Sequence, residues 1–245
     1  MKPFKQFAHR QFKSLIGHLK KYEGSHDPEL LHKVRVDVKK IKAVLFVIDD
    51  CTRGFKAHKN FIPFRKIFRR AASIREPDVL ARLARQYKMD EISGDLTPGR
   101  IENLIIAFDA DIPHFIKTIK KRRAKLQPHL KHVRKTDLTT YIQSTKKEVK
   151  SRLYPKPAMN IIHKVRKKVK EAIYLSEIND QLKKKETKFY SKIQRIIGQL
   201  HDKQVLLDHL SDKRNFAGNA QYETIRSACT ADKRKIFSLA SHFYG

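Results

Sequence analysis

The sequence is poor in the residues that mark disulfide-rich and β-rich proteins. Its 245 residues include only 2 Cys, 8 Gly, 9 Pro and no Trp. Cys51 and Cys229 have no C-x-x-C spacing, which is expected of reduced thiols in a cytoplasmic protein rather than of a disulfide framework. The few glycines and prolines leave little material for the frequent turns of a sandwich or barrel. We therefore expect a mainly helical protein.

Long apolar runs are missing as well. The first residues lack the apolar segment of about 7–15 residues that a signal peptide needs. The most hydrophobic run, residues 43–48, is far shorter than the roughly 18 residues of a membrane span. We therefore expect a cytoplasmic protein with no membrane span.

Acidic residues are scarce relative to basic ones. There are 25 Asp and Glu against 55 Lys and Arg, and the net charge is +30. A small domain needs a net charge of only about 2–8 to stay in solution, so solubility does not explain this excess. Hydrophobic residues make up 40% of the chain, enough for a core, which excludes a disordered basic tail. The composition favours a large anionic partner.

Apolar residues recur with helical periodicity along most of the chain. Asp27 and Pro28 are a typical N-cap and first residue of a helix, and the stripe that follows runs from Leu31 to Ile48 with spacings of three and four. Together with this helix, seven further stretches predict an all-α fold of eight helices joined by short loops, hence a helical bundle. The stretches are 4–21, 61–87, 101–126, 138–153, 161–172, 189–210 and 220–243.

The chain contains an internal repeat. The sequence HKVR occurs at residues 32–35 and again at 163–166, and IREPDVL at 74–80 matches LHDKQVL at 200–206. Because the offsets of 131 and 126 residues are so similar, we interpret the repeat as a duplication. It predicts two four-helix bundles related by pseudo-two-fold symmetry, residues 1–128 and 129–245, with a boundary near Pro128. Pro77 predicts a kink in its helix.

Cations border the apolar stripes of both HKVR helices. Residues 33–42 contain one acid, Asp37, and residues 164–170 contain none, whereas a merely solvated face usually alternates acids with bases. Such faces suit an anionic ligand that neutralises them. For the two histidines a hydrogen-bonded packing role is the alternative. The predicted anion-binding residues are His32, Arg35, Lys39, Lys40, Lys42, Arg65, Arg69, Arg75, His163, Arg166, Lys167, Lys170, Lys192 and Arg195, and the cations of residues 117–125 are a further candidate.

These motifs resemble those of the CHAD family, the "conserved histidine α-helical domain", over nearly the whole chain. The resemblance rests on HKVRVDVKKIK and HKVRKKVKEAIY, each followed by a charged, Val-Leu-rich segment, IREPDVLARL or LHDKQVLLDHL. It implies two four-helix bundles and a basic surface or channel that binds inorganic polyphosphate, with an association with polyphosphate granules. Glu171 and Ile173 depart from the family pattern at positions that are usually basic, so we expect fewer contacts from the second half.

Two other classes of function compete with this interpretation. The charge also suits nonspecific binding of RNA or DNA, but the sequence has no RNP-like, C₂H₂ or KH-like motif. An enzyme of phosphate-chain metabolism would be expected to carry a P-loop or an E-x-E-x-K pattern, and neither is present. The histidine pairs His129/His132 and His201/His209 lack a third ligand at a recognisable spacing. We expect a binding protein without catalysis, cofactor or metal.

Overall fold

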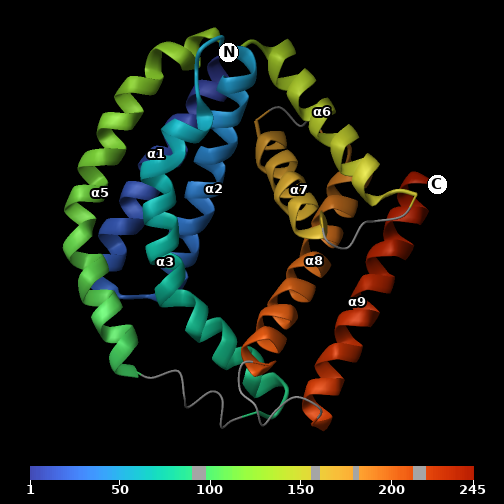
Figure 1. Cartoon of the computed structure of the whole chain (residues 1–245). Coiled ribbons are helices and arrows are strands. Elements are labelled where there is room, and N and C mark those ends of the chain that lie inside the picture. The colour runs from blue at the N-terminus through green and yellow to red at the C-terminus, as the bar shows by residue number, and fades with distance from the viewer. Residues whose placement is uncertain (90–97, 156–160, 179–181, 212–218) are drawn as a thin grey trace. The chain divides into compact units, whose positions relative to one another are not determined.

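The protein is helical throughout the part of the chain that the structure describes. The computed structural model describes residues 1–89, 98–155, 161–178, 182–211 and 219–245, and in these ranges it contains eight α-helices and no strand (Figure 1). The all-α prediction is confirmed. The helices are α1 (Lys2–Ser25), α2 (Pro28–Cys51), α3 (Ala57–Gln86), α5 (Pro98–His132), α6 (Lys135–Leu153), α7 (Ile162–Ser176), α8 (Lys184–Ser211) and α9 (Ala220–Tyr244).

Polar side chains fix the starts of two helices. The Asp27 carboxylate accepts a hydrogen bond of 2.9 Å from the Glu29 main-chain N–H, and Pro28 occupies the first position of α2, as the sequence predicts. The Asn219 side chain accepts a 2.7 Å bond from the Tyr222 N–H at the start of α9. Each cap satisfies a main-chain donor that the first turn of a helix leaves unpaired.

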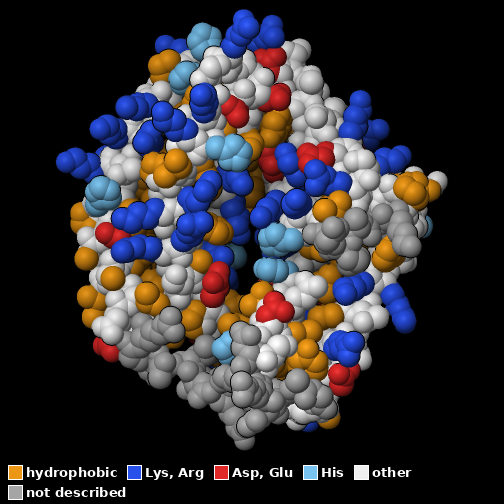
Figure 2. Space-filling model, viewed as in Figure 1, with side chains coloured by type: hydrophobic (Ala, Val, Ile, Leu, Met, Phe, Trp, Pro, Cys, Tyr) orange, Lys and Arg blue, Asp and Glu red, His pale blue; other side chains and the backbone are white. Residues whose placement is uncertain are grey.

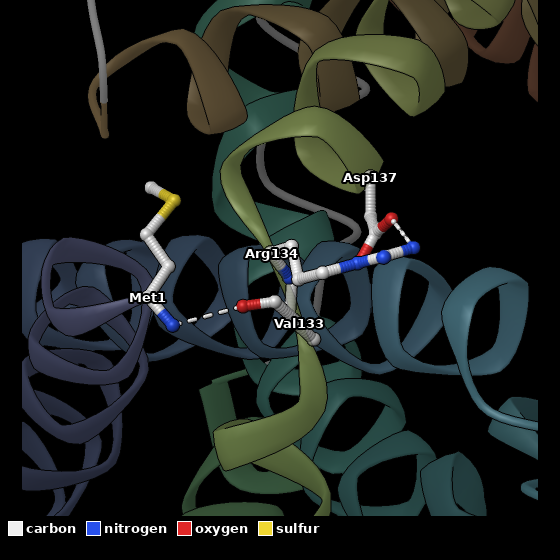
Figure 3. Close-up of polar contacts among 4 residues, drawn as sticks. All are labelled: Met1, Val133, Arg134 and Asp137. Atoms are coloured by element: carbon white, nitrogen blue, oxygen red, sulfur yellow. Dashed lines mark hydrogen bonds and ion pairs between the residues drawn. The ribbon is translucent and has the colours of Figure 1, made fainter.

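The boundary between the two sequence halves near Pro128 stays a prediction, whereas the predicted helix end at residue 126 is too early, because α5 continues through Pro128 to His132. The chain turns at Val133 and Arg134 instead (Figure 3). There the Arg134 main-chain N–H donates to the Asp137 carboxylate at 2.8 Å, and the Arg134 guanidinium donates to both carboxylate oxygens at 3.2 and 3.0 Å. These hydrogen bonds lower the pKa of Asp137. The Met1 amino group donates to the Val133 carbonyl at 2.9 Å, which ties α1 to the same turn.

The chain forms two compact units that are not successive along the sequence. The first contains Met1–Pro77, Thr97–Ile142 and Tyr174–Gln181, and the second contains Asp78–Leu96, Gln143–Ile173 and Leu182–Gly245. The first therefore holds α1, α2, α5 and most of α3, while α8, α9 and most of α6 and α7 belong to the second. Helix α3 passes from one unit to the other at Pro77, where it stays helical. This composition is compatible with two four-helix bundles, and the pseudo-two-fold relation stays a prediction.

The core of the first unit is built on the phenylalanines of α1. Phe4, Phe7 and Phe12 are at most 2% exposed, and α1 packs against α2 and α5. Phe12 meets Phe64 of α3 edge-on, with ring centroids 5.9 Å apart. The predicted α2 stripe is buried over its whole length, and Val38, in its middle, is 0% exposed. The helical periodicity therefore identified the face of α2 that enters the core.

In the second unit α8 packs against α9, and the buried stripe of α7 starts one residue later than predicted. Ile162 is 5% exposed and Val165 and Val169 are fully buried, whereas Ile161 lies just before the helix and is half-buried. The stripe therefore follows the spacing 162, 165, 169 and 172. No helix in the described ranges is both long and apolar enough to cross a membrane.

Val38→Ala and Val165→Ala should each lower the free energy of unfolding by about 1–3 kcal/mol, because each truncation removes buried methyl groups and leaves a cavity. Urea titration followed by circular dichroism measures this loss. Val205, which is 37% exposed, offers a control of the same residue type. Val205→Ala should change the stability by less than about 0.5 kcal/mol. Equal losses at all three positions would contradict the assignment of the two cores.

Candidate anion-binding surface

Basic side chains on α2 lie at the border between the core and the solvent. Arg35, Lys39 and Lys42 are half-buried and follow one another at intervals of four and three residues, so they share one face of the helix. In the view of Figure 2, Lys and Arg side chains gather over the first unit, and few Asp or Glu side chains lie among them. The aliphatic stems are therefore packed while the charged groups reach the surface.

Two aromatic rings of α3 support these cations. The Phe68 ring centroid lies 4.7 Å from the Arg35 guanidinium carbon and 5.4 Å from Lys39 Nζ. The Phe61 ring lies 5.4 Å from Lys42 Nζ and 5.9 Å from the Arg65 guanidinium carbon. A cation over an aromatic face gains about 0.5–1 kcal/mol at exposed sites. Because a ring carries no net charge, this support orders the cations without neutralising them.

We call this surface the α2–α3 basic face: Arg35, Lys39 and Lys42 of α2 and Arg65 of α3, standing on Phe61 and Phe68. The sequence predicted the four cations, whereas the helical spacing of Phe61, Phe64 and Phe68 favours core positions over a base-stacking platform for both rings. That assignment is right for Phe61, which is 8% exposed, whereas Phe68 is half-buried against the edge of the core. The two rings are seven residues apart on α3, with Arg65 between them and Arg69 directly after the second. The alternation of these phenylalanines with arginines along one helix was the sign in the sequence that the rings also support cations.

The one acid within residues 33–42 is directed away from the basic face. Asp37 is 5% exposed, and its carboxylate oxygen lies 2.7 Å from Nδ1 of His18 on α1. Burial raises the pKa of Asp37, and the hydrogen bond with His18 opposes that rise. The carboxylate therefore faces α1 inside the unit and does not neutralise the α2–α3 basic face.

Acidic partners do meet some of the predicted residues. The exposed Glu76 carboxylate lies 3.5 Å from the Arg35 guanidinium, and Lys40 makes a 2.8 Å ion pair with Glu177 and lies over the Tyr174 ring. Lys40 thus contacts the segment around Tyr174 and is not part of the α2–α3 basic face. Exposed ion pairs are worth at most about 1 kcal/mol, so an anionic ligand can compete with either carboxylate.

The other basic residues of α3 differ in how far they are neutralised. Arg69 is exposed and Arg75 is half-buried. Arg70, by contrast, forms an ion pair with Asp111 of α5 and donates a 3.0 Å hydrogen bond to the Ala107 carbonyl. Arg70 therefore connects α3 to α5 and is not part of the basic face.

The second unit supports its motif residues differently. The Arg166 guanidinium lies against Gly198 of α8 so closely that a Cβ at this glycine would be 2.9 Å from Nη2. Arg166 Nε is buried and has no hydrogen-bond partner among the described residues. The His163 and His201 rings approach to 4.6 Å between centroids. Sequence reasoning missed Gly198, because the need for a glycine appears only when α7 and α8 are packed together.

The remaining predicted residues of the second unit lie nearer the solvent. Lys170 is half-buried on α7, and the exposed residues are Lys167 on α7 and Lys192 and Arg195 on α8. His32 of the first unit is half-buried on α2.

Acidic side chains are also present among the cations of α7. Glu171, one of the departures from the family pattern, lies 3.6 Å from Lys168, which also lies 3.4 Å from Glu148. Part of the charge of α7 is therefore balanced within the unit. In the described part of the chain, no group of three or more His, Cys, Asp and Glu side chains is placed to hold a metal ion.

These features define a basic, all-α protein whose motif cations are packed at the helix surface. Residues 6–211 match the model of the CHAD domain family, and the chain belongs to that family. Among solved structures it is similar to the CHAD domain from the plant Ricinus communis, with 15% identity and a TM-score of 0.70. That match covers 98% of this chain and 90% of the plant chain, and at this identity it shows the fold. No curated protein matches the chain.

Gly198→Ala should displace the Arg166 guanidinium, because the new methyl group would occupy its place. Alanine in a helix is about 0.5–1 kcal/mol more favourable than glycine, and the lost packing of Arg166 offsets this gain. Gly17 of α1 is the matched control, since nothing lies within 4 Å of a Cβ built there. Urea unfolding should show a clear stabilisation for Gly17→Ala and a smaller one, or none, for Gly198→Ala. Equal stabilisation would show that Arg166 is not held against α8.

Proposed function

We propose that this protein binds inorganic polyphosphate through the α2–α3 basic face and the motif cations of α7. The observation that carries the proposal is the aromatic support of Arg35 and Lys39, which holds two cations side by side over one uncharged ring. Membership of the CHAD family adds to it through the resemblance of both motif helices.

A linear phosphate chain suits such a face for physical reasons. It offers repeated oxyanions and no bases or sugars to read, so a row of cations is a sufficient receptor. From Arg35 to Lys42 the helix rises by about 10 Å, at 1.5 Å per residue, which is long enough to contact several successive phosphates. Arginine engages two oxygens with its planar fork and lysine donates from a mobile ammonium group, so the mixed face tolerates shifts in register.

The second unit adds a smaller set of contacts in this proposal. The buried Arg166 Nε is a donor that a phosphate oxygen would satisfy. His163 and His32 lie beside the motif arginines in sequence, and nearby phosphates favour the protonated imidazole, which donates from both nitrogens. The Glu171–Lys168 pair reduces the charge available on α7, in line with the weaker contribution expected from the second half.

We infer that the protein binds polyphosphate without catalysing a reaction. We also infer that it lies in the cytoplasm and associates with polyphosphate granules. Support for a non-catalytic role comes from the sequence, which has neither a P-loop nor an E-x-E-x-K pattern. Nonspecific binding of RNA or DNA is the competing function, since a net charge of +30 attracts any phosphate backbone. The phosphate polymer is favoured because the cations are supported by packed rings, which leaves no exposed aromatic platform for stacked bases on this face.

Replacing Arg35, Lys39, Arg166 and Lys170 together by Ala should weaken the binding of long-chain polyphosphate at physiological salt by about a hundredfold or more. Loss of several charge-assisted hydrogen bonds, each worth roughly 1.5–3 kcal/mol, accounts for that magnitude. All four side chains border the cores rather than fill them, so the helical content should remain. Calorimetric titration and circular dichroism measure the two effects.

The matched control replaces four exposed cations of the same types, Lys13, Lys20, Arg226 and Arg234, and should weaken binding only slightly. Equal weakening in both variants would show that net charge alone attracts the polymer. Competition of polyphosphate against RNA and single-stranded DNA tests the alternative function. Preference of the unsubstituted protein for either nucleic acid would overturn the proposal.

Glu76→Gln should strengthen polyphosphate binding by about twofold to fivefold, because it removes an exposed carboxylate that competes for Arg35 and repels the ligand. Glu23→Gln, at an exposed position of α1, makes the same change in net charge and is the control. The effect should shrink as salt is added, since screening weakens both repulsion and attraction. An affinity that rises equally in both variants would exclude a specific role of Arg35.

A further inference from the structure

We propose a second anion-binding site in the first unit, in a pocket between the start of α3 and the C-terminal part of α5, for a compact ligand that carries two or more phosphate groups. The pocket has a volume of about 560 Å³ and is here called the α3–α5 pocket. Its lining consists of Gly54, Phe55, Lys56, Lys59, Asn60, Arg122, Lys125 and His129.

The lining is basic and contains no Asp or Glu. Lys56 and Lys59 come from the start of α3, while Arg122 and Lys125 come from α5. The α5 residues, with His129, recur at intervals of three and four, so a single helix face presents all three to the pocket. Like charges around a concavity repel one another, and the low-dielectric walls concentrate their positive potential. A multiply charged anion relieves this repulsion.

Main-chain geometry adds donors at the same place. Helix α3 begins at Ala57, within the lining segment, and the first turn of an α-helix leaves its N–H groups without partners inside the helix. Gly54 has φ +83°, a left-handed conformation that glycine adopts without strain and that turns the chain into α3. The Asn60 main-chain N–H and side-chain amide both donate to the Lys56 carbonyl, at 3.1 and 2.9 Å. These bonds fix the first turn and occupy the carbonyl that would repel an anion.

An apolar base supports the pocket. Phe55 is 9% exposed, and its ring packs against the His129 ring with 4.9 Å between centroids. The imidazole is thereby held on the same face of α5 as Lys125. The site thus combines ordered main-chain donors, mobile ammonium groups and an imidazole.

The dimensions define the ligand class. Pockets for small molecules measure about 300–1,000 Å³, so this one accommodates a compact anion rather than a long polymer. Its several cations exceed what one phosphate needs and match a chain of two or three. The same chemistry is offered by a free oligophosphate and by the phosphate tail of a nucleoside triphosphate. The site shares no residue with the α2–α3 basic face, so it does not depend on the function proposed above.

The test uses the full chain in which Arg35, Lys39, Arg166 and Lys170 are replaced by Ala, so that the basic faces do not contribute. Titration with tripolyphosphate at physiological salt should still show binding. Adding Lys59→Ala and Lys125→Ala should weaken it about tenfold or more, because two charge-assisted contacts are lost. Adding Lys13→Ala and Lys20→Ala, at exposed α1 positions outside the lining, should change it by less than about twofold.

Further titrations distinguish the sources of the ligand. ATP binding as tightly as tripolyphosphate supports recognition of a triphosphate tail, and weaker ATP binding supports a free oligophosphate. Orthophosphate binding as tightly as either would overturn the claim of a multiply phosphorylated ligand. Equal losses in the pocket and control variants, or no loss in the pocket variant, would overturn the site itself.

A second measurement covers the case in which the background variant does not fold. In the unsubstituted protein, tripolyphosphate should protect Lys56, Lys59 and Lys125 from acetylation more than Lys13 and Lys20, as quantified by mass spectrometry. Uniform protection of all five lysines would overturn the site. Because this readout is local, it separates failure of the pocket from failure of polyphosphate binding at the basic faces.

Discussion

Mutual repulsion among 55 Lys and Arg side chains is the constraint that the whole fold has to satisfy. A buried acid reduces this repulsion in the second unit, where the Asp232 carboxylate lies 2.6 Å from Lys203 Nζ. Phenylalanine rings act at the helix surface, where they stabilise cations without cancelling their charge. The protein thus keeps its interior balanced and its basic face positive.

The extent of the helices was largely predictable, because apolar periodicity reports which face enters a core. The predicted starts were late where the first turn is polar, as in α8, which begins at Lys184 and not at Phe189. The predicted end of α5 was early, because Pro128 suggested a break and the capping contacts of Asp137 that set the real turn depend on geometry. Propensity locates the elements, and tertiary contacts then set their ends.

Of the candidate site, the sequence could supply the cations but not their supports. The spacing of Arg35, Lys39 and Lys42 along one helix is enough to predict that they share a face. It does not predict the roles of Phe68 and Gly198, since these arise only where a second helix packs against the motif helix. In the first copy of the motif Arg35 lies over the Phe68 ring, whereas in the second copy Arg166 lies against the backbone at Gly198. Identical motifs therefore do not guarantee equal contributions.

The passage of α3 through both units bears on how the chain could have evolved. Its residues up to Pro77 belong to the first unit and its end to the second, while Tyr174–Gln181 from the later half of the sequence belongs to the first, where Leu175 is fully buried. Each unit thus contains a segment from the opposite half of the sequence. If the repeat arose by duplication, neither copy could be lost or transferred alone without exposing apolar side chains to water. The two halves of the sequence therefore depend on each other for their buried surfaces.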